Sequence, residues 1–161
     1  MTIHLYDYAE ILPQVDTLPS LRLSYAVEET GWAAVLEPGV VLLTNLPSGG
    51  SLRLYDIVTL EPPDDPDALP CAGNLLQRYF SAALWITYPP GASAAETGVH
   101  YRAVQAVIEA VGGVTEGLVP GVLVANLPAH AVATVREQLA QQLGVTVQAL
   151  EVDEKGDEAE G

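Results

Sequence analysis

The sequence predicts an α+β protein, in which a small antiparallel β-barrel-like unit is followed by a ferredoxin-like βαββαβ sandwich. Residues 82–152 alternate strand, helix, strand, strand, helix, strand, whereas residues 1–81 hold several short apolar runs separated by turn residues. Evenly spaced short strands of that kind are typical of a small barrel. Residues 153–161 are rich in acids and poor in apolar side chains, so we expect them to form an acidic flexible tail.

Short strands account for most of the β-rich unit. Residues 21–27 carry an apolar side chain at every second position, which places those side chains on one face of a strand. Two apolar runs, 33–36 and 40–43, flank the turn pair Pro38-Gly39. Residues 52–60 give the strongest strand pattern of this half, because they are rich in β-branched and aromatic residues and end at two prolines.

The other segments of this unit have weaker patterns. Residues 3–8 alternate loosely and predict one more strand. Residues 61–73 interleave prolines with acids, and proline cannot donate a hydrogen bond within a central sheet. We therefore expect this segment to be a solvated loop between two strands.

The sandwich has clearer signals. An apolar stripe predicts a helix over 97–111, which the pair Gly112-Gly113 ends, and a second stripe predicts a helix over 129–143, which Gly144 ends. Four strands surround these helices and complete the βαββαβ order: 83–88, 114–119, 122–125 and 145–150.

The charge balance excludes some partners. The chain of 161 residues has 21 acids and six bases, a net charge of −15, with 49% apolar residues. Phosphate backbones and anionic membrane surfaces are bound through Lys and Arg, so neither nucleic acid nor membrane is an expected partner. The N-terminus lacks the basic start of a secretory signal, Cys71 has no second cysteine to pair with, and the apolar runs are short. These features predict a cytoplasmic protein.

Two segments carry most of the excess charge. Four acids lie within residues 61–67 and six within residues 151–160. Such clusters attract a basic protein surface across the Debye length of roughly 8–10 Å. The acids predicted to contact a basic protein partner are Asp64, Asp65, Asp67, Glu151, Asp153 and Glu154.

The sequence contains no recognisable metal, cofactor or catalytic motif. The three histidines, at positions 4, 100 and 130, and Cys71 lie far apart, without the spacing of a metal site. Cys71 follows an acidic loop, which disfavours its thiolate form. We therefore expect no catalytic residue, no metal and no cofactor.

The order of features resembles an uncharacterised bacterial domain family that pairs a small N-terminal β-unit with a ferredoxin-like C-terminal unit. The matching segments, within residues 40–150, are Asn45-Leu46-Pro47, Tyr55-Asp56-Ile57-Val58, Leu84 to Tyr88, Tyr101 to Val111, Val122 to Pro128 and Ala129 to Leu143. The family usually carries glycine where Tyr55 stands here. The resemblance implies the two-part fold and brings no established activity.

One cluster near the start of the first helix has the residue types of a pocket. His100, Tyr101 and Arg102 are consecutive, and Glu96 precedes them by about one helical turn. The alternative is that Arg102 pairs with a surface carboxylate. Trp32 and Trp85 are expected to be core or half-buried anchors, because an exposed tryptophan would instead indicate an interface.

These observations predict a non-enzymatic acidic protein–protein interaction module, of the immunity or inhibitor type, for a basic partner. The alternative is a small-ligand-sensing ferredoxin-like regulatory domain. Self-association through a sheet edge is also compatible with the predicted fold, because edge strands invite pairing.

Overall fold

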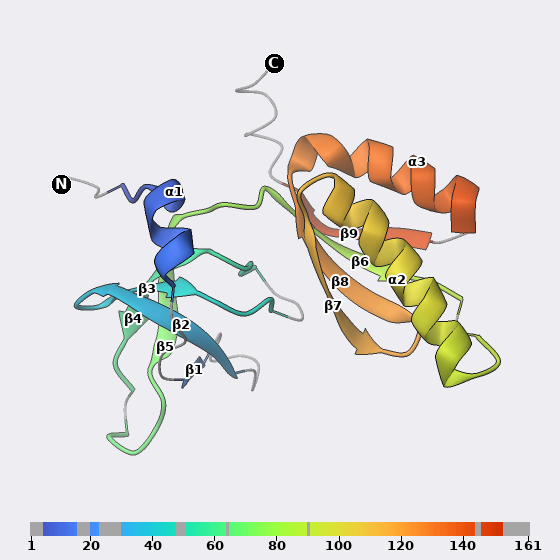
Figure 1. Ribbon diagram of the computed structural model, residues 1–161. Helices are drawn as coiled ribbons and strands as arrows, with labels where there is room; N and C mark the ends of the chain where they lie inside the picture. Colours follow the sequence, from blue (N-terminus) through green and yellow to red (C-terminus); the bar gives the residue numbers. More distant parts are fainter. Residues whose placement is uncertain are drawn as a thin grey trace. The chain divides into compact units, whose positions relative to one another are not determined.

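The computed structural model describes residues 5–15, 20–22, 30–47, 51–63, 65–89, 91–143 and 146–152. The chain divides into two compact units. Unit 1 comprises Met1–Pro47 and Leu52–Tyr79, and unit 2 comprises Ser48–Ser51 and Phe80–Gly161. Each unit has its own sheet, and helices accompany both sheets, so the predicted α+β class is confirmed (Figure 1). The predicted tail 153–161 lies outside the described residues.

In the residues of unit 1 that the structure describes, five strands pair in chain order. The four successive ladders are antiparallel, as predicted. The first and last strands are joined by a single parallel pair, Arg22 with Cys71, so the sheet is not antiparallel throughout. The strands are β1 (Ser20–Arg22), β2 (Thr30–Glu37), β3 (Val40–Leu43), β4 (Ile57–Glu61) and β5 (Cys71–Gln77).

Both faces of the middle strands of unit 1 are covered. One face presents Val41 and Val58 to a core cluster that includes Leu21, while the other presents Leu42 and Ile57 to side chains of the N-terminal segment. That segment forms the helix α1 (Tyr8–Ile11) and the 3₁₀ turn η1 (Leu12–Gln14). Burial on both faces explains why these strands are continuous apolar runs instead of alternating ones.

Three predictions for unit 1 are corrected. The strand expected over 3–8 is absent from its described part, residues 5–8, because the Asp7 side chain caps a helix by accepting a hydrogen bond from the Ala9 N–H at 2.9 Å. The strand expected over 52–60 begins only at Ile57. Tyr55 lies in a turn with φ of 66°, a left-handed conformation that favours glycine, which the resembled family carries there.

The third correction concerns the loop expected over 61–73, which ends early because β5 begins at Cys71. The sequence of this strand does not alternate between apolar and polar residues, so no local pattern predicts it. Contacts with β4 hold it in place. The Thr59 hydroxyl accepts a hydrogen bond from the Asn74 N–H at 2.8 Å. A Cβ on Gly73 would lie 2.5 Å from the same hydroxyl oxygen, so glycine lets the two strands approach closely.

Unit 2 has a four-stranded antiparallel sheet in the order β7-β8-β6-β9. Its helices α2 and α3 lie on one face of this sheet (Figure 1). The elements are β6 (Ala82–Thr87), α2 (Ala94–Ala110), β7 (Val114–Val119), β8 (Val122–Leu127), the 3₁₀ turn η2 (Ala129–Ala131), α3 (Val132–Leu143) and β9 (Thr146–Val152). All four predicted strands and both predicted helices of this half are present.

The core of unit 2 follows from two periodicities. Every second residue of β6 and β8 faces the helices, among them Leu84, Ile86 and Leu123, and the helical stripes supply Ile108 and Leu139. All five side chains are fully buried. Burial of one such side chain contributes about 1.5–3 kcal/mol, so this layer supplies much of the stability of the unit.

Helix α2 begins earlier than the predicted 97–111. Ser93 is its N-cap and accepts a hydrogen bond from the Glu96 N–H, while Glu96 Oε2 accepts one from the Ala92 N–H at 2.6 Å. This arrangement is close to a capping box. The helix ends as predicted, where Gly112 takes the left-handed φ of 84°.

Candidate functional site

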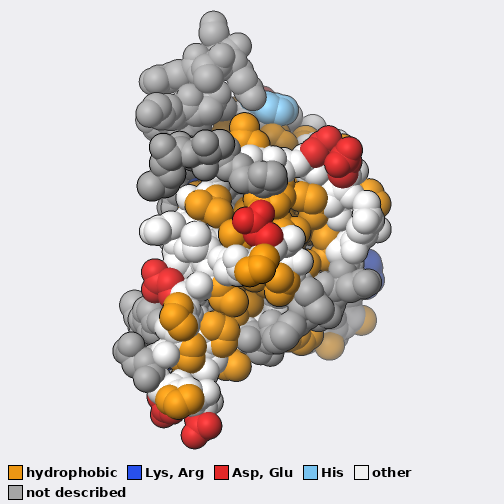
Figure 2. Space-filling view, turned by 90° about the vertical axis from the view of Figure 1, so that its left-hand side faces the viewer, with side chains coloured by type: hydrophobic (Ala, Val, Ile, Leu, Met, Phe, Trp, Pro, Cys, Tyr) orange, Lys and Arg blue, Asp and Glu red, His pale blue; other side chains and the backbone are white. Residues whose placement is uncertain are grey.

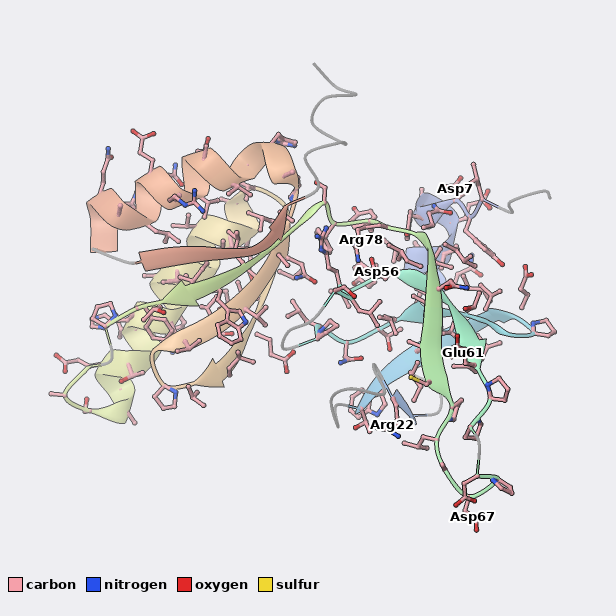
Figure 3. The ribbon with its side chains drawn as sticks, turned by 180° about the vertical axis from the view of Figure 1, so that it is seen from behind. Asp7, Arg22, Asp56, Glu61, Asp67 and Arg78 are labelled. Atoms are coloured by element: carbon pink, nitrogen blue, oxygen red, sulfur yellow. The ribbon has the colours of Figure 1, made fainter. Side chains whose placement is uncertain are left out.

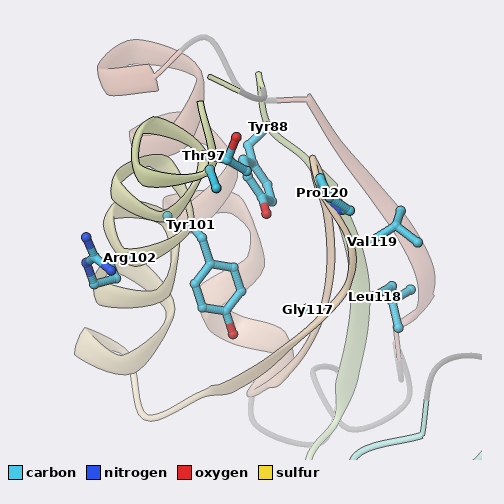
Figure 4. Close-up of a pocket in the computed structure, with 10 residues that line it drawn as sticks. Tyr88, Thr97, Tyr101, Arg102, Gly117, Leu118, Val119 and Pro120 are labelled. Carbon is cyan, nitrogen blue, oxygen red and sulfur yellow. The ribbon is translucent and has the colours of Figure 1, made fainter. Parts of the chain in front are cut away.

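Unit 2 has a pocket of about 470 Å³ between the first half of α2 and the turn that joins β7 to β8 (Figure 4). One wall comes from the helix, the other from the end of β7 and its turn, and Tyr88 follows directly after β6. The lining residues are Tyr88, Ala94, Thr97, Gly98, Tyr101, Arg102, Gly117, Leu118, Val119 and Pro120.

Two tyrosine rings shape this pocket. Tyr88 is only 4% exposed, and the ring of Tyr101 meets it edge-on, with centroids 6.3 Å apart and planes at 61°. The Tyr88 N–H donates to the Gly121 carbonyl oxygen at 2.9 Å, which ties the end of β6 to the β7–β8 turn. Gly117 lies beside the second ring: a Cβ there would be 3.4 Å from Cε2 of Tyr101. Both rings reach into the space between helix and turn (Figure 4).

The polar groups at the start of α2 hold the loop before the helix. The Thr97 hydroxyl donates to the Ser93 carbonyl oxygen at 3.1 Å and accepts from the Gly91 N–H at 2.9 Å. His100 Nδ1 lies 2.6 Å from the Pro89 carbonyl oxygen. A carbonyl oxygen only accepts, so this ring nitrogen carries the proton.

Of the four residues predicted to line a pocket, the structure brings only Tyr101 and Arg102 to it. His100 and Glu96 are instead engaged with the loop, through Pro89 and Ala92 respectively. Sequence reasoning missed the other wall, because Gly117 to Pro120 carry no side-chain chemistry that marks a site.

Arg102 lies at the rim of the pocket and is exposed to solvent. Its guanidinium is close to Gly98, since a Cβ at that glycine would be 3.5 Å from Nη1. In the part of the chain that the structure describes, Arg102 forms no ion pair, so the predicted pairing with a surface carboxylate is not observed there.

A second group of ionisable residues is buried in unit 1 (Figure 3). Asp56 is 0% exposed, and its oxygens Oδ1 and Oδ2 accept hydrogen bonds from Nε and Nη2 of Arg78 at 3.0 and 2.8 Å. Oδ2 also accepts from the Arg53 N–H at 2.8 Å. Burial raises the pKa of Asp56, and the Arg78 guanidinium opposes this shift.

The pKa of a neighbouring residue, Tyr8, is raised as well. Burial, and then the negative charge of Asp56, raise the pKa of the Tyr8 hydroxyl. The ring of Tyr79 packs edge-on against Tyr8 and Tyr55, with centroids 5.1 and 5.8 Å away. These contacts pin the 53–56 turn to the N-terminal helix, which is a stabilising role.

The acids predicted to contact a partner are only partly described. Asp65 and Asp67 are exposed, and Figure 3 shows Asp67 at the tip of the loop between β4 and β5. The Asp67 N–H donates to Asp65 Oδ1 at 2.9 Å, which turns the chain there. Glu151 belongs to β9, opposite Ala83 of β6. Asp64, Asp153 and Glu154 lie outside the described residues.

Other candidates lack the geometry of a reactive centre. Cys71 is buried, and burial raises the pKa of its thiol, which disfavours the thiolate. Among the described residues, no three His, Cys, Asp or Glu side chains are grouped so that they could hold a metal ion. No described helix is long and apolar enough to cross a membrane.

The expected burial of the tryptophans is wrong for Trp32, which is 54% exposed on β2. Trp85 is 37% exposed, close to the predicted half-buried state. In the view of Figure 2, hydrophobic side chains are exposed at the surface, with scattered acidic groups among them. Exposed aromatic anchors of this kind are typical of binding surfaces.

Comparisons with known proteins place the fold without assigning an activity. No protein-family model matches the chain, and no curated protein matches it. A crystal structure of a hypothetical protein from Neisseria gonorrhoeae is similar to 83% of this chain and 94% of its own, with a TM-score of 0.56 and 16% sequence identity. At that identity the likeness shows a shared fold, consistent with an uncharacterised family.

Proposed function

We propose that the chain is a non-enzymatic binding module and that the pocket of unit 2 holds its small ligand. The observation that carries this proposal is the pocket itself, of about 470 Å³. Small-molecule sites are concave, mostly apolar, about 300–1,000 Å³ in volume, and contain a few polar groups that orient the ligand. The hydroxyls of Tyr88 and Tyr101 are such groups here (Figure 4).

The fold supports the small-ligand reading by analogy. A sheet order of β7-β8-β6-β9 with two helices on one face is the order of a ferredoxin-like sandwich, and we propose that name for unit 2. Likewise, the ring of strand pairings supports a barrel-like description of unit 1. Fold analogy alone assigns no ligand, so the pocket residues carry the functional argument.

The chemistry of the lining favours binding over catalysis. The residues that line the pocket, all within the described part of the chain, include no carboxylate, imidazole or thiol. General acid–base and nucleophilic catalysis rely chiefly on those groups. Tyrosine rings and an arginine instead provide stacking area, hydroxyl donors and one positive charge.

A pocket-filling substitution tests this proposal. Gly98 lies on the helical wall, where an added Cβ meets only the guanidinium of Arg102, so Gly98→Leu places a side chain in the pocket without a backbone clash. In ligand-observed NMR with a panel of small aromatic and aliphatic compounds, we expect the unsubstituted protein to bind at least one compound with a Kd of about 0.1–1 mM. The variant should bind the same compound at least about tenfold more weakly.

The matched control is Val99→Leu, one residue further along the helix. Val99 is exposed and does not line the pocket, so binding should be unchanged in this variant. Equal binding by both variants and the unsubstituted protein would place the ligand elsewhere, and a panel without any binder would remove the proposal.

A second candidate function is the acidic interaction module for a basic protein partner. The exposure of Trp32 and of the loop acids Asp65 and Asp67 favours it, together with the net charge of −15. In a pull-down from lysate, recovery of a basic partner should fall with added salt and with the variant Asp65→Asn/Asp67→Asn. Recovery that is indifferent to both changes would count against this candidate.

A further inference from the structure

We infer that the ligand of the unit 2 pocket is a small uncharged molecule with an aliphatic body and a carbonyl or hydroxyl oxygen that accepts a hydrogen bond from Tyr88. This inference rests on the proposed function and deepens it, because it assigns a chemical class to the ligand. Three features of the pocket carry it: the Tyr88 hydroxyl, the position of the charged side chain, and the apolar groups around the remaining space.

The Tyr88 side chain is held in place, while its hydroxyl is left to a ligand. The residue is 4% exposed and belongs to the core cluster of unit 2, and its backbone N–H donates to the Gly121 carbonyl oxygen at 2.9 Å. The hydroxyl points into the space between α2 and the β7–β8 turn (Figure 4). It forms no hydrogen bond with the residues that the structure describes, so it is available to donate to a ligand oxygen.

The pocket offers a ligand no charge beside this hydroxyl. Among the lining residues, all of which the structure describes, Arg102 alone is charged, and Figure 4 shows it on the outer side of α2, away from the rings of Tyr88 and Tyr101. A carboxylate or ammonium group that enters the pocket would lose hydration without gaining a counter-charge, which is costly. The net charge of −15 adds a repulsion against anions. These conditions favour a neutral ligand.

The space that remains is bordered mainly by apolar groups. The ring of Tyr101 already lies against Gly117, where an added Cβ would be 3.4 Å from its Cε2, so a further flat ring finds no slot there. Ala94 on α2 and Val119 and Pro120 on the opposite wall contribute only apolar side chains, and Val119 is 60% exposed. An aliphatic body gains by covering such groups, because the burial of apolar area is favourable and non-directional.

The test uses three probes that share a cyclohexyl body: the neutral cyclohexanecarboxamide, the anion cyclohexanecarboxylate and the cation cyclohexylmethylammonium. Isothermal titration of the full chain should give at least about tenfold tighter binding of the amide than of either ion. Tyr88→Phe retains the ring and removes the hydroxyl, so it should weaken binding of the amide by about three- to tenfold. The matched control is Tyr79→Phe, which should leave binding unchanged, because Tyr79 belongs to unit 1 and does not line the pocket.

The outcomes separate the inference from the proposed function. Binding of either ion as tight as that of the amide, or equal effects of Tyr88→Phe and Tyr79→Phe, would overturn the inference while a pocket ligand of another class remains. The comparison of probes needs no variant, so it decides the charge of the ligand even where a substitution disturbs the fold. If only charged or purely aromatic compounds of the panel bind, the inference again fails alone. If no compound binds, both fail together.

Discussion

Replacement of Arg78 by methionine is expected to lower the free energy of unfolding of unit 1 by about 3–5 kcal/mol at neutral pH. Methionine retains the apolar stem but leaves the carboxylate of Asp56, which is 0% exposed, without its two guanidinium hydrogen bonds. A buried charge that loses its partner is among the largest single-residue effects in proteins. Urea denaturation followed by Trp32 fluorescence, in a Trp85→Phe background, isolates unit 1 in this measurement.

The loss of unfolding free energy caused by Arg78→Met should depend on pH. Without the guanidinium, burial raises the folded-state pKa of Asp56 further above the unfolded value, opposed only by the hydrogen bond from the Arg53 N–H and by the charge of Arg53. A carboxyl group with a raised folded-state pKa stabilises the protein below its unfolded pKa, and that contribution is lost as pH rises through the folded-state pKa. The deficit of the variant should therefore be larger at about pH 8 than at about pH 5.

Two further variants complete this experiment. Asp56→Asn in combination with Arg78→Met should recover part of the loss, because the amide oxygen can still accept from the Arg53 N–H without a buried charge. Arg102→Met is the control, since its guanidinium is exposed, and it should stay within about 0.5 kcal/mol of the unsubstituted protein. A similarly small effect of Arg78→Met would show that the buried pair does not hold unit 1 together.

Ile108→Ala is expected to destabilise unit 2 by about 2–5 kcal/mol. Ile108 is 0% exposed and belongs to the core between α2 and the sheet. The backbone after the helix closes over it, since a Cβ on Gly113 would lie 2.6 Å from its Cγ2. Truncation therefore leaves a cavity that the surroundings cannot fill easily.

The measurement for Ile108→Ala is urea denaturation followed by Trp85 fluorescence in a Trp32→Phe background. The control on the same helix is Val99→Ala, because Val99 is 56% exposed and alanine is the better helix former. It should leave stability unchanged or slightly higher. A cost for Ile108→Ala no larger than that of the control would mean that α2 does not pack on the sheet through its apolar stripe.

The helices and strands of unit 2 were predictable because their sequence patterns are local. Apolar residues spaced four apart put Val104 and Ile108 on one face of α2, and the two-residue period of a strand puts Leu84 and Ile86 of β6 on one face of the sheet. Neither pattern needs knowledge of a distant partner. Even the early start of α2 has a local signal, the spacing of Ser93 and Glu96.

The helices and strands of unit 1 were less predictable because contacts between residues far apart in the sequence determine where they begin and end. The β-branched and aromatic residues over 52–60 predict a strand, but a buried ion pair to Arg78 and the left-handed Tyr55 turn the chain before Ile57. Strand β5 lacks a strong pattern of its own, and it depends on Thr59 of β4. Of the segments of unit 1 whose predictions are corrected, the one that becomes α1 did carry a local signal, because Asp7 and Glu10 have the spacing of a helix start.

Only the helical wall of the candidate site was predictable from the sequence, for a similar reason. Tyr101 and Arg102 are neighbours in sequence and carry recognisable chemistry, so they could be identified as pocket residues. The opposite wall comes from Gly117 to Pro120, which join the site only when β7 and β8 fold back beside α2. Glycines and a proline turn have no chemical signature, and only the tertiary structure assigns them a role.

Chemical-shift mapping of the full chain with the tightest-binding compound of the panel tests most directly whether the pocket of unit 2 is the binding site. The account predicts that backbone amide shifts concentrate on the two walls, around Gly98 and Arg102 on α2 and around Gly117 on β7, and that they saturate. Shifts that cluster around Trp32 and the β4–β5 loop of unit 1, or no saturable shifts at all, would contradict it.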